Sequence, residues 1–149
     1  FSINIDNIEV FKEFLIKKYN SLAIDKGNCK TLYLDSIILP TALNAEFYNN
    51  IDVLSPFGTG NSEPKFLIEN LNLVNSNIVG DRHIRAIFYS KSKDVVKAIA
   101  FNSIGTVLES YLAKNNKSSM NIVGTLTSNN YNGKNNIEFV INDISVNNI

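Results

Sequence analysis

Basic and aromatic side chains are interleaved along residues 82–101, a pattern suited to holding single-stranded nucleic acid. Binding of this kind needs a basic groove for the phosphates and exposed rings on which bases stack. A solvated hairpin would have much the same composition, so both interpretations stay open. Strand alternation favours Arg85 and Lys97 for phosphate contact, because it directs them away from core neighbours. The candidate cations are Arg82, Arg85, Lys91, Lys93 and Lys97.

The aromatic residues divide into expected core rings and candidate stacking rings. Phe and Tyr in strands are most often core residues, and on that basis we assign Phe88 and Phe101 to the core. Tyr89 alternates with Phe88 and is therefore a candidate for stacking. Further along, a polar loop between two expected strands carries Tyr131 and Lys134, which form a second candidate pair for nucleic acid.

Catalytic and metal-binding chemistry finds little support among the remaining polar residues. A single cysteine, Cys29, excludes an internal disulfide and a cysteine-cluster metal site. The single histidine, His83, is expected either to contact a phosphate or to make a hydrogen bond at the start of a strand. Glu9 and Glu13 are expected on a solvated helix face, because no metal ligand or nucleophile lies nearby in the sequence. We therefore assign no catalytic residue and no metal ligand to this chain.

Composition and charge narrow the class of protein. The 149 residues suit one ordinary domain, or one domain with part of another. Net charge is zero, but residues 1–63 carry five Lys and eight acidic residues, whereas residues 64–149 carry nine Lys or Arg and six acidic residues. Nucleic-acid binding is therefore expected in the second half. No apolar run approaches a membrane span and no signal sequence is recognisable, so we expect a cytoplasmic protein without a membrane partner.

The first third of the chain is expected to form a helix, a strand and a second helix. Residues 6–9 have the spacing of a capping box, and apolar residues then recur at helical intervals to residue 22. Residues 31–39 are rich in Leu, Ile and Tyr and predict a strand that ends at Pro40. Apolar residues from 43 to 54 predict the second helix, which ends before Pro56. Because the sequence begins at Phe1 rather than Met, we expect a fragment of a longer protein.

The remaining residues predict a small barrel. Strands are expected over residues 66–73, with a bulge at Glu69-Asn70, and over residues 84–89 and 95–101. A helix over residues 104–112 follows, and then a hairpin whose strands cover residues 122–126 and 137–146. Three strands, a helix and a closing hairpin are the element order of an OB-fold, a five-stranded barrel that commonly binds oligonucleotides. The predicted fold class is thus mixed α+β, an OB-type barrel preceded by a helix-strand-helix segment.

A segment rich in glycine and proline separates the helical part from the barrel. Its two glycines permit a tight path, and its prolines fix the directions of entry and exit. A rigid elbow between domains is favoured over a phosphate-binding loop, because no Lys-Ser or Lys-Thr pair follows. The segment is Pro56-Phe57-Gly58-Thr59-Gly60-Asn61-Ser62-Glu63-Pro64-Lys65-Phe66.

This segment resembles the Pro-Phe-Gly-x-Gly-Asn-x-Glu-Pro-x-Phe signature that precedes the OB domain of RecJ exonucleases. Further similarities in the same order extend the resemblance over most of residues 43–146. They are His83-Ile84-Arg85, Ala100-Phe101-Asn102, Val123-Gly124 and Asn142-Asp143-Ile144. The resemblance implies that residues 1–55 end a DHH-associated domain and its connecting helix, and that residues 56–149 form the OB domain.

The resemblance also implies what the whole protein does. A RecJ-like parent would hydrolyse single-stranded DNA from 5′ to 3′ in repair and recombination, using Mn or Mg ions held by Asp-His-His and related motifs. Those motifs are not in this sequence, so the fragment is expected to bind single-stranded DNA without cleaving it. Single-strand-binding protein or other repair proteins are possible partners. Two alternatives stay open: a module for contact with repair or replication proteins, and part of a related DHH-group phosphodiesterase acting on oligonucleotides.

Overall fold

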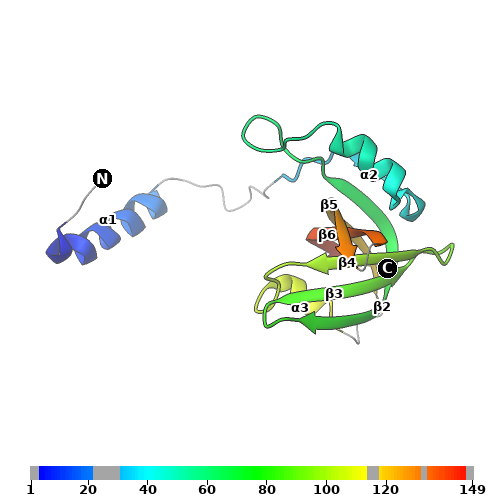
Figure 1. The fold of residues 1–149 in the computed structure, drawn as a ribbon. Coiled ribbons are helices and arrows are strands. Elements are labelled where there is room, and N and C mark those ends of the chain that lie inside the picture. The colour runs from blue at the N-terminus through cyan, green and yellow to red at the C-terminus, as the bar shows by residue number, and fades with distance from the viewer. Residues whose placement is uncertain (1–3, 22–30, 114–117, 132–133, 147–149) are drawn as a thin grey trace. The chain divides into compact units, whose positions relative to one another are not determined.

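The computed structural model describes residues 4–21, 31–113, 118–131 and 134–146. The chain divides into two compact units, residues 1–32 and residues 33–149 (Figure 1). The first unit contains a 3-10 turn, η1 (Ile5–Asn7), and helix α1 (Ile8–Ser21). Asn4 caps η1, accepting a hydrogen bond from the backbone N–H of Asp6 at 3.3 Å. The helix therefore follows a short 3-10 turn instead of beginning at the expected capping box.

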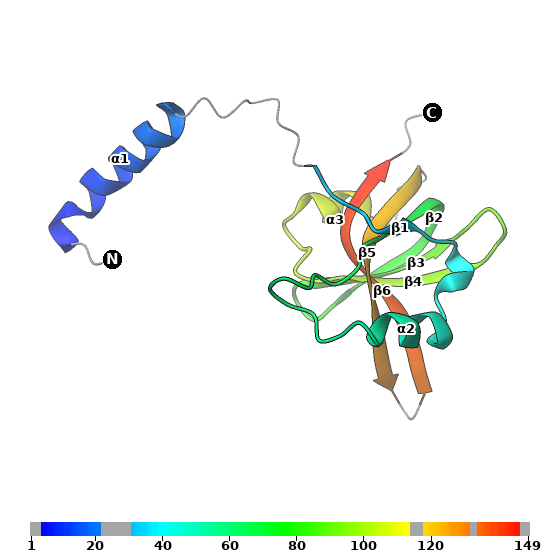
Figure 2. The ribbon, with the colours of Figure 1, turned by 90° about the horizontal axis from the view of Figure 1, so that it is seen from above.

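The second unit is built on a closed barrel of five strands. These are β2 (Phe66–Val79), β3 (His83–Tyr89), β4 (Val95–Ala100), β5 (Ser119–Tyr131) and β6 (Lys134–Val146). The sheet order is β1-β2-β3-β4-β6-β5, and an additional pairing of β2 with β5 closes the barrel (Figure 2). Helix α3 (Val107–Tyr111) lies between β4 and β5 in the sequence. This arrangement confirms the predicted OB-type barrel, with its helix between the third and fourth barrel strands.

Strand β2 pairs with both β3 and β5, and it can do so because it is bent. Its pairing with β5 shifts register between Ile68 and Leu71, and Asn70 in that shift has a φ of 57°. A second shift, between Leu73 and Asn75, interrupts its pairing with β3. Bulges of this kind increase the local bend and twist of a strand. The bulge expected at Glu69-Asn70 is therefore present, and it lets one strand serve both neighbours.

The segment before the barrel packs onto it through a helix. The strand expected over residues 31–39 is reduced to β1 (Ser36–Ile37), which pairs in parallel with the start of β2. A 3-10 turn, η2 (Pro40–Ala42), leads to α2 (Ala45–Asp52), whose first turn is capped by Asn44. Phe47 and Ile51 of α2 pack against the barrel core. Residues 33–55 are thus part of the same compact unit as the barrel.

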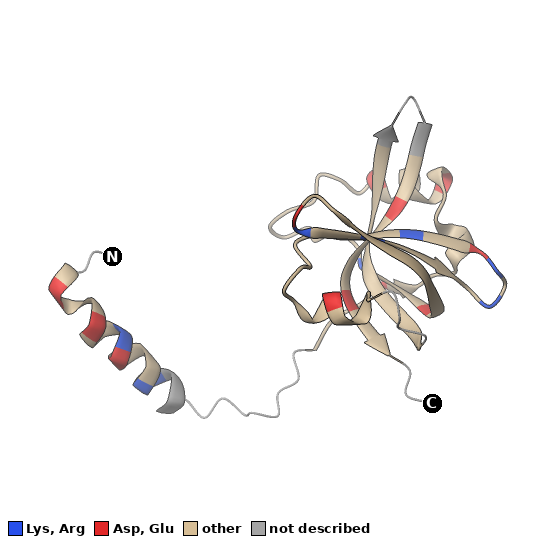
Figure 3. Cartoon of the chain, turned by 90° about the horizontal axis from the view of Figure 1, so that it is seen from below, with Lys and Arg blue, Asp and Glu red and all other residues tan. Residues whose placement is uncertain are grey.

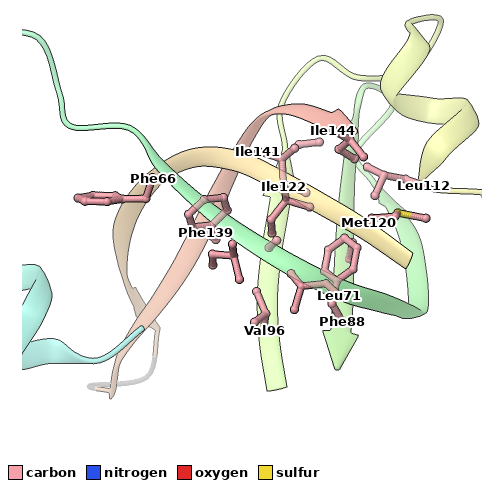
Figure 4. Packing of buried hydrophobic residues seen from close by; sticks show 14 of the residues in the cluster. Phe66, Leu71, Phe88, Val96, Leu112, Met120, Ile122, Phe139, Ile141 and Ile144 are labelled. Atoms are coloured by element: carbon pink, nitrogen blue, oxygen red, sulfur yellow. The ribbon is translucent and has the colours of Figure 1, made fainter. Parts of the chain in front are cut away.

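The barrel interior is filled by large apolar side chains from every barrel strand. Fully buried examples are Ile68, Leu71, Phe88, Val96, Leu112, Met120, Ile122 and Phe139 (Figure 4). Leu112, just after α3, closes one side of this cluster. At Gly124 a Cβ atom would collide with the carbonyl oxygen of Val140, so β5 and β6 approach more closely there than any side chain would allow. Among the described helices, none is long and apolar enough to cross a membrane.

Candidate nucleic-acid interface

Strand alternation places one set of β3 and β4 side chains on the outer surface of the barrel. Ala86 and Phe88 on β3, and Val96 and Ala98 on β4, point into the core and are fully buried. The side chains between them point outward. We call this outer surface the β3–β4 face. Its residues are His83, Arg85, Ile87 and Tyr89 from β3, and Val95, Lys97, Ile99 and Phe101 from β4 and the residue after it.

Cross-strand register arranges these side chains in rows. Tyr89 lies opposite Val95, and Ile87 lies opposite Lys97. Tyr89 is 43% exposed, as expected for a stacking candidate. It lies at one end of the face, and His83 lies six residues away at the other, about 20 Å at the usual strand rise. That span accommodates several nucleotides of an extended single strand.

His83 and Phe101 form the second aromatic end of the face. Their ring centroids are 5.2 Å apart with an interplanar angle of 78°, an edge-to-face contact. The ring nitrogen Nδ1 of His83 accepts a hydrogen bond from the backbone N–H of Asn102 at 2.9 Å. Phe101 is 51% exposed, so its assignment to the core was wrong. Phe101 comes directly after Ala100, the last residue of β4, and continues the strand's alternation on the outward side. Its ring therefore contacts His83 instead of entering the barrel.

The centre of the face is covered by its own side chains. The side chain of Ile99 faces outward by strand phase, yet the residue is only 6% exposed. Strands β5 and β6 continue the face, because Phe139 and Leu126 pair inward while Thr127 and Glu138 form an outward pair. Glu138 is nevertheless buried, at 8% exposure. Outward residues this inaccessible are covered by neighbouring side chains. Arg85 on β3 lies opposite Ile99 on β4, which lies beside Val140 on β6.

Glu138 of β6 and Arg85 of β3 form an ion pair across the intervening strand β4. The Nη2 atom of Arg85 lies 3.5 Å from Oε2 of Glu138. The carboxylate side chain is 10% exposed, whereas the arginine side chain is 44% exposed. Ala98 pairs with Phe139 in the parallel ladder of β4 and β6. Lys97 and Glu138 directly precede these two residues, so they occupy neighbouring positions on the two strands. Sequence reasoning missed Glu138; its one signal was an acidic residue alternating with apolar ones in a core strand.

A hollow of about 300 Å³ lies beside Lys97 and extends the face toward α2. It begins at the capped N-terminus of α2 and reaches the start of β6. Its polar lining contrasts with the apolar core beneath the face. The lining residues are Leu43, Asn44, Ala45, Val95, Lys97, Asn136 and Ile137.

The other predicted cations lie at the two ends of the face. Lys91 and Lys93 are exposed in the β3–β4 turn, which Asp94 and Ser90 hold through a hydrogen bond of 3.1 Å between their side chains. Basic residues at the tip of this hairpin are visible in Figure 3. Arg82 is exposed in the β2–β3 turn, and its carbonyl oxygen accepts a hydrogen bond from the backbone N–H of Ser103 at 2.9 Å. The cations are thus spread over two strands and the two turns at their ends, not gathered at one point.

The second candidate pair, Tyr131 and Lys134, belongs to the β5–β6 hairpin. Their backbones pair with each other at its tip. Their side chains lie outside what the structure describes, so their role stays a prediction.

The glycine-rich segment forms a tight turn held by its own asparagine. Gly58 and Asn61 exchange two backbone hydrogen bonds, of 2.8 and 3.1 Å, and Gly60 has a φ of 87°. The Asn61 side chain also donates to the carbonyl oxygens of Leu54, at 2.9 Å, and Pro56, at 3.0 Å. Two backbone N–H groups of the loop are therefore already satisfied internally. This geometry favours the elbow interpretation of the motif, including Phe57 and Pro64 at its two ends.

In the part of the chain that the structure describes, no group of three or more His, Cys, Asp or Glu could hold a metal ion. We derive no catalytic step for this chain.

Comparison with known proteins gives both a fold and a family. The RecJ OB domain model matches residues 34–143. The chain is similar to the crystal structures of RecJ from Thermus thermophilus in complex with Mn²⁺ (TM-score 0.65, 22% identity) and with Mg²⁺ (TM-score 0.63, 21% identity). Both matches cover 97% of this chain, which spans only about a fifth of those chains, 20% and 21% respectively. No curated protein matches the chain. At these identities the solved structures establish the fold alone, and the family model, which covers most of the sequence, establishes that this chain belongs to the RecJ OB domain family.

Proposed function

We propose that this chain is the single-stranded-DNA-binding part of a RecJ-like 5′ to 3′ exonuclease, and that it guides the strand toward a catalytic core elsewhere in the parent protein. The observation that supports this most is the β3–β4 face. It combines partly exposed aromatic residues at both ends with cations on its strands and at its hairpin turn. These are the parts that sequence-tolerant binding of single strands requires.

Each part of the face has a distinct task in this proposal. Tyr89 at one end and Phe101 at the other present ring faces or edges to bases. Lys97, with Lys91 and Lys93 beyond it, attracts phosphates along the rim. The hollow beside Lys97 gives the strand a path toward α2 and the β5–β6 hairpin.

The chemistry of the parent is likewise a proposal. The two Thermus thermophilus structures contain Mn²⁺ and Mg²⁺, and a metal-dependent core in this parent would supply the ions that activate water. The present chain would contribute substrate binding alone, in a cytoplasmic repair and recombination enzyme. We retain the assignment of residues 1–55 to the end of a DHH-associated domain as part of this proposal.

The test is titration of the 149-residue chain into fluorescently labelled oligo-dT at several salt concentrations. We expect binding that weakens with salt and that K91E/K97E reduces, together with its salt dependence. The matched control, K12E/K17E, makes the same change in net charge on α1, whose residues are not part of the face. Absence of binding at low salt, or equal loss in both double variants, would contradict the proposal.

A second candidate function is contact with a repair or replication protein. An apolar groove of about 360 Å³ favours it, because the groove lies between the end of β2 and α3, where Ile78 is 64% exposed. Exposed apolar surface of this kind often marks a protein interface. A pull-down of single-strand-binding protein by the wild-type chain in nuclease-treated buffer, lost in I78D, would support this candidate. The third possibility, a DHH-group phosphodiesterase, is disfavoured by membership of the RecJ OB domain family.

A further inference from the structure

We propose that Glu138 masks the charge of Arg85 and that Arg85 exchanges this carboxylate for a DNA phosphate when a single strand binds. The inference rests on the proposed function and adds to it a residue that regulates the strength of phosphate contact. Glu138 would act through Arg85 and would not itself touch the strand.

The two partners differ in how freely they can move. Glu138 is enclosed at the centre of the face, with a side chain that is 10% exposed. Arg85 reaches it from β3 with a side chain that is 44% exposed. An arginine has a long stem and a guanidinium that keeps its charge at all ordinary pH values. Arg85 can therefore turn to a phosphate on the rim, while Glu138 stays in place.

The contact between them is long enough to be exchanged. At 3.5 Å the separation of Nη2 and Oε2 lies beyond the usual range of a charge-assisted hydrogen bond, about 2.7–2.9 Å. A phosphate on the rim can offer Arg85 a shorter, bidentate contact in return. The exchange is favoured when two short hydrogen bonds to a phosphate replace one long contact with Glu138.

A buried carboxylate needs a remaining partner after Arg85 leaves. Breaking a buried pair is costly when one charge is left without compensation. Lys97 occupies the neighbouring register position on β4, and Thr127 lies opposite Glu138 on β5. The positive charge of Lys97 on the neighbouring strand lowers the cost of leaving the carboxylate without a paired cation, while Lys97 itself stays directed to phosphate. Arg85 is the cation that pairs with Glu138 in the described structure, and it is the one that exchanges.

The expected consequence is weak phosphate binding at the centre of the face. The carboxylate of Glu138 repels phosphates from the centre of the face and lowers the effective charge of Arg85. Phosphates then follow the rim, and base stacking at the two ends contributes more of the affinity. A strand held in this way can move along the face more easily than one held by unmasked cations.

The test is the charge-removing, nearly isosteric variant E138Q in the full 149-residue chain. We expect it to bind oligo-dT about three- to tenfold more tightly at low salt, as a newly freed cation would allow. The slope of log K against log salt should become steeper by about 0.7, the value for one extra single-strand phosphate. The double variant R85Q/E138Q should lose both gains. The matched control E63Q removes a carboxylate from an exposed position in the glycine-rich segment, outside the β3–β4 face, and should leave the slope unchanged.

Outcomes separate this inference from the proposed function. If the wild-type chain binds oligo-dT and a folded E138Q binds no more tightly, with an unchanged slope, the masking role is overturned while the DNA-binding function stands. If neither the wild-type chain nor E138Q binds oligo-dT, both the masking role and the DNA-binding function are overturned. In case E138Q does not fold, the Nε–Hε resonance of Arg85 in the wild-type chain gives a second readout by NMR. A shift of that resonance on saturation with oligo-dT supports the exchange, and an unchanged resonance overturns it.

Discussion

The side-chain amide of Asn61 donates a hydrogen bond of 2.9 Å to the carbonyl oxygen of Leu54, which lies just after α2. The same amide also reaches the carbonyl oxygen of Pro56, at 3.0 Å. One side chain thus ties the end of the helix to the glycine turn that leads into the barrel. The family motif is therefore a structural connection as well as a signature.

We expect N61A to lower the free energy of unfolding by about 1–2 kcal/mol, because both carbonyl oxygens lose a donor in a partly exposed loop. N61D should be destabilising by a similar amount, because a carboxylate cannot donate to either carbonyl oxygen. Urea unfolding followed by circular dichroism gives the measurement. S62A, at the next exposed position, is the control and should leave stability unchanged. If N61A unfolds at the same urea concentration as the wild type, the stability of the elbow does not depend on Asn61.

Gly124 offers a test of the close approach of β5 and β6. A methyl group there would meet the carbonyl oxygen of Val140, so we expect G124A to cost about 3 kcal/mol or more through displaced backbone. Thermal unfolding reports the change as a lower Tm. G58A is the matched control, since a Cβ at Gly58 meets nothing within 4 Å. Equal effects of the two variants would contradict the packing described at the β5–β6 pair.

The exposed aromatic residues should separate binding from stability. We expect Y89A and F101A each to weaken oligo-dT binding by about 1–3 kcal/mol, the range for loss of one stacked base. Their Tm values should change much less than that of a core variant, because Tyr89 is 43% and Phe101 51% exposed. By contrast, F88A should unfold the barrel more easily, by about 3–5 kcal/mol. Y33A, at an 84% exposed ring outside the face, is the binding control. Unchanged affinity in both Y89A and F101A would remove stacking from the mechanism.

Truncation distinguishes two domain boundaries. Residues 33–149 form one compact unit, so a chain that starts at Tyr33 should unfold at the same urea concentration as the full chain. A chain that starts at Pro56 lacks Ile38, Phe47 and Ile51, which pack on the barrel core. We expect it to be less stable by about 3 kcal/mol or more, the cost of losing buried large side chains. Equal stability of the two truncated chains would instead favour a barrel domain that begins at residue 56.

Much of the fold was predictable because its signals are local. Alternation predicted that Phe88 points inward and Tyr89 outward, and slippage of that pattern predicted the bulge at Asn70. The strand expected over residues 31–39 shows the limit of such reasoning. An apolar run becomes a strand only where it has a partner, and only Ser36 and Ile37 pair with β2.

The candidate site was predictable in composition but not in geometry. Its cations and Tyr89 were identified from charge and alternation, whereas Phe101 was assigned to the wrong side. The phase at the end of β4 and the position of His83 decide where that ring lies. Such contacts depend on how two strand ends meet, which is not encoded in either strand alone.

By itself, then, the sequence determined the family motif and the order of helices and strands, because both depend on residues close together in the chain. Only the tertiary structure decided that Arg85 pairs with Glu138, which lies 53 positions further along. Their proximity follows from the antiparallel register of β3 and β4 together with the parallel register of β4 and β6. That register is set by closure of the whole barrel, so no local pattern around either residue could have predicted it.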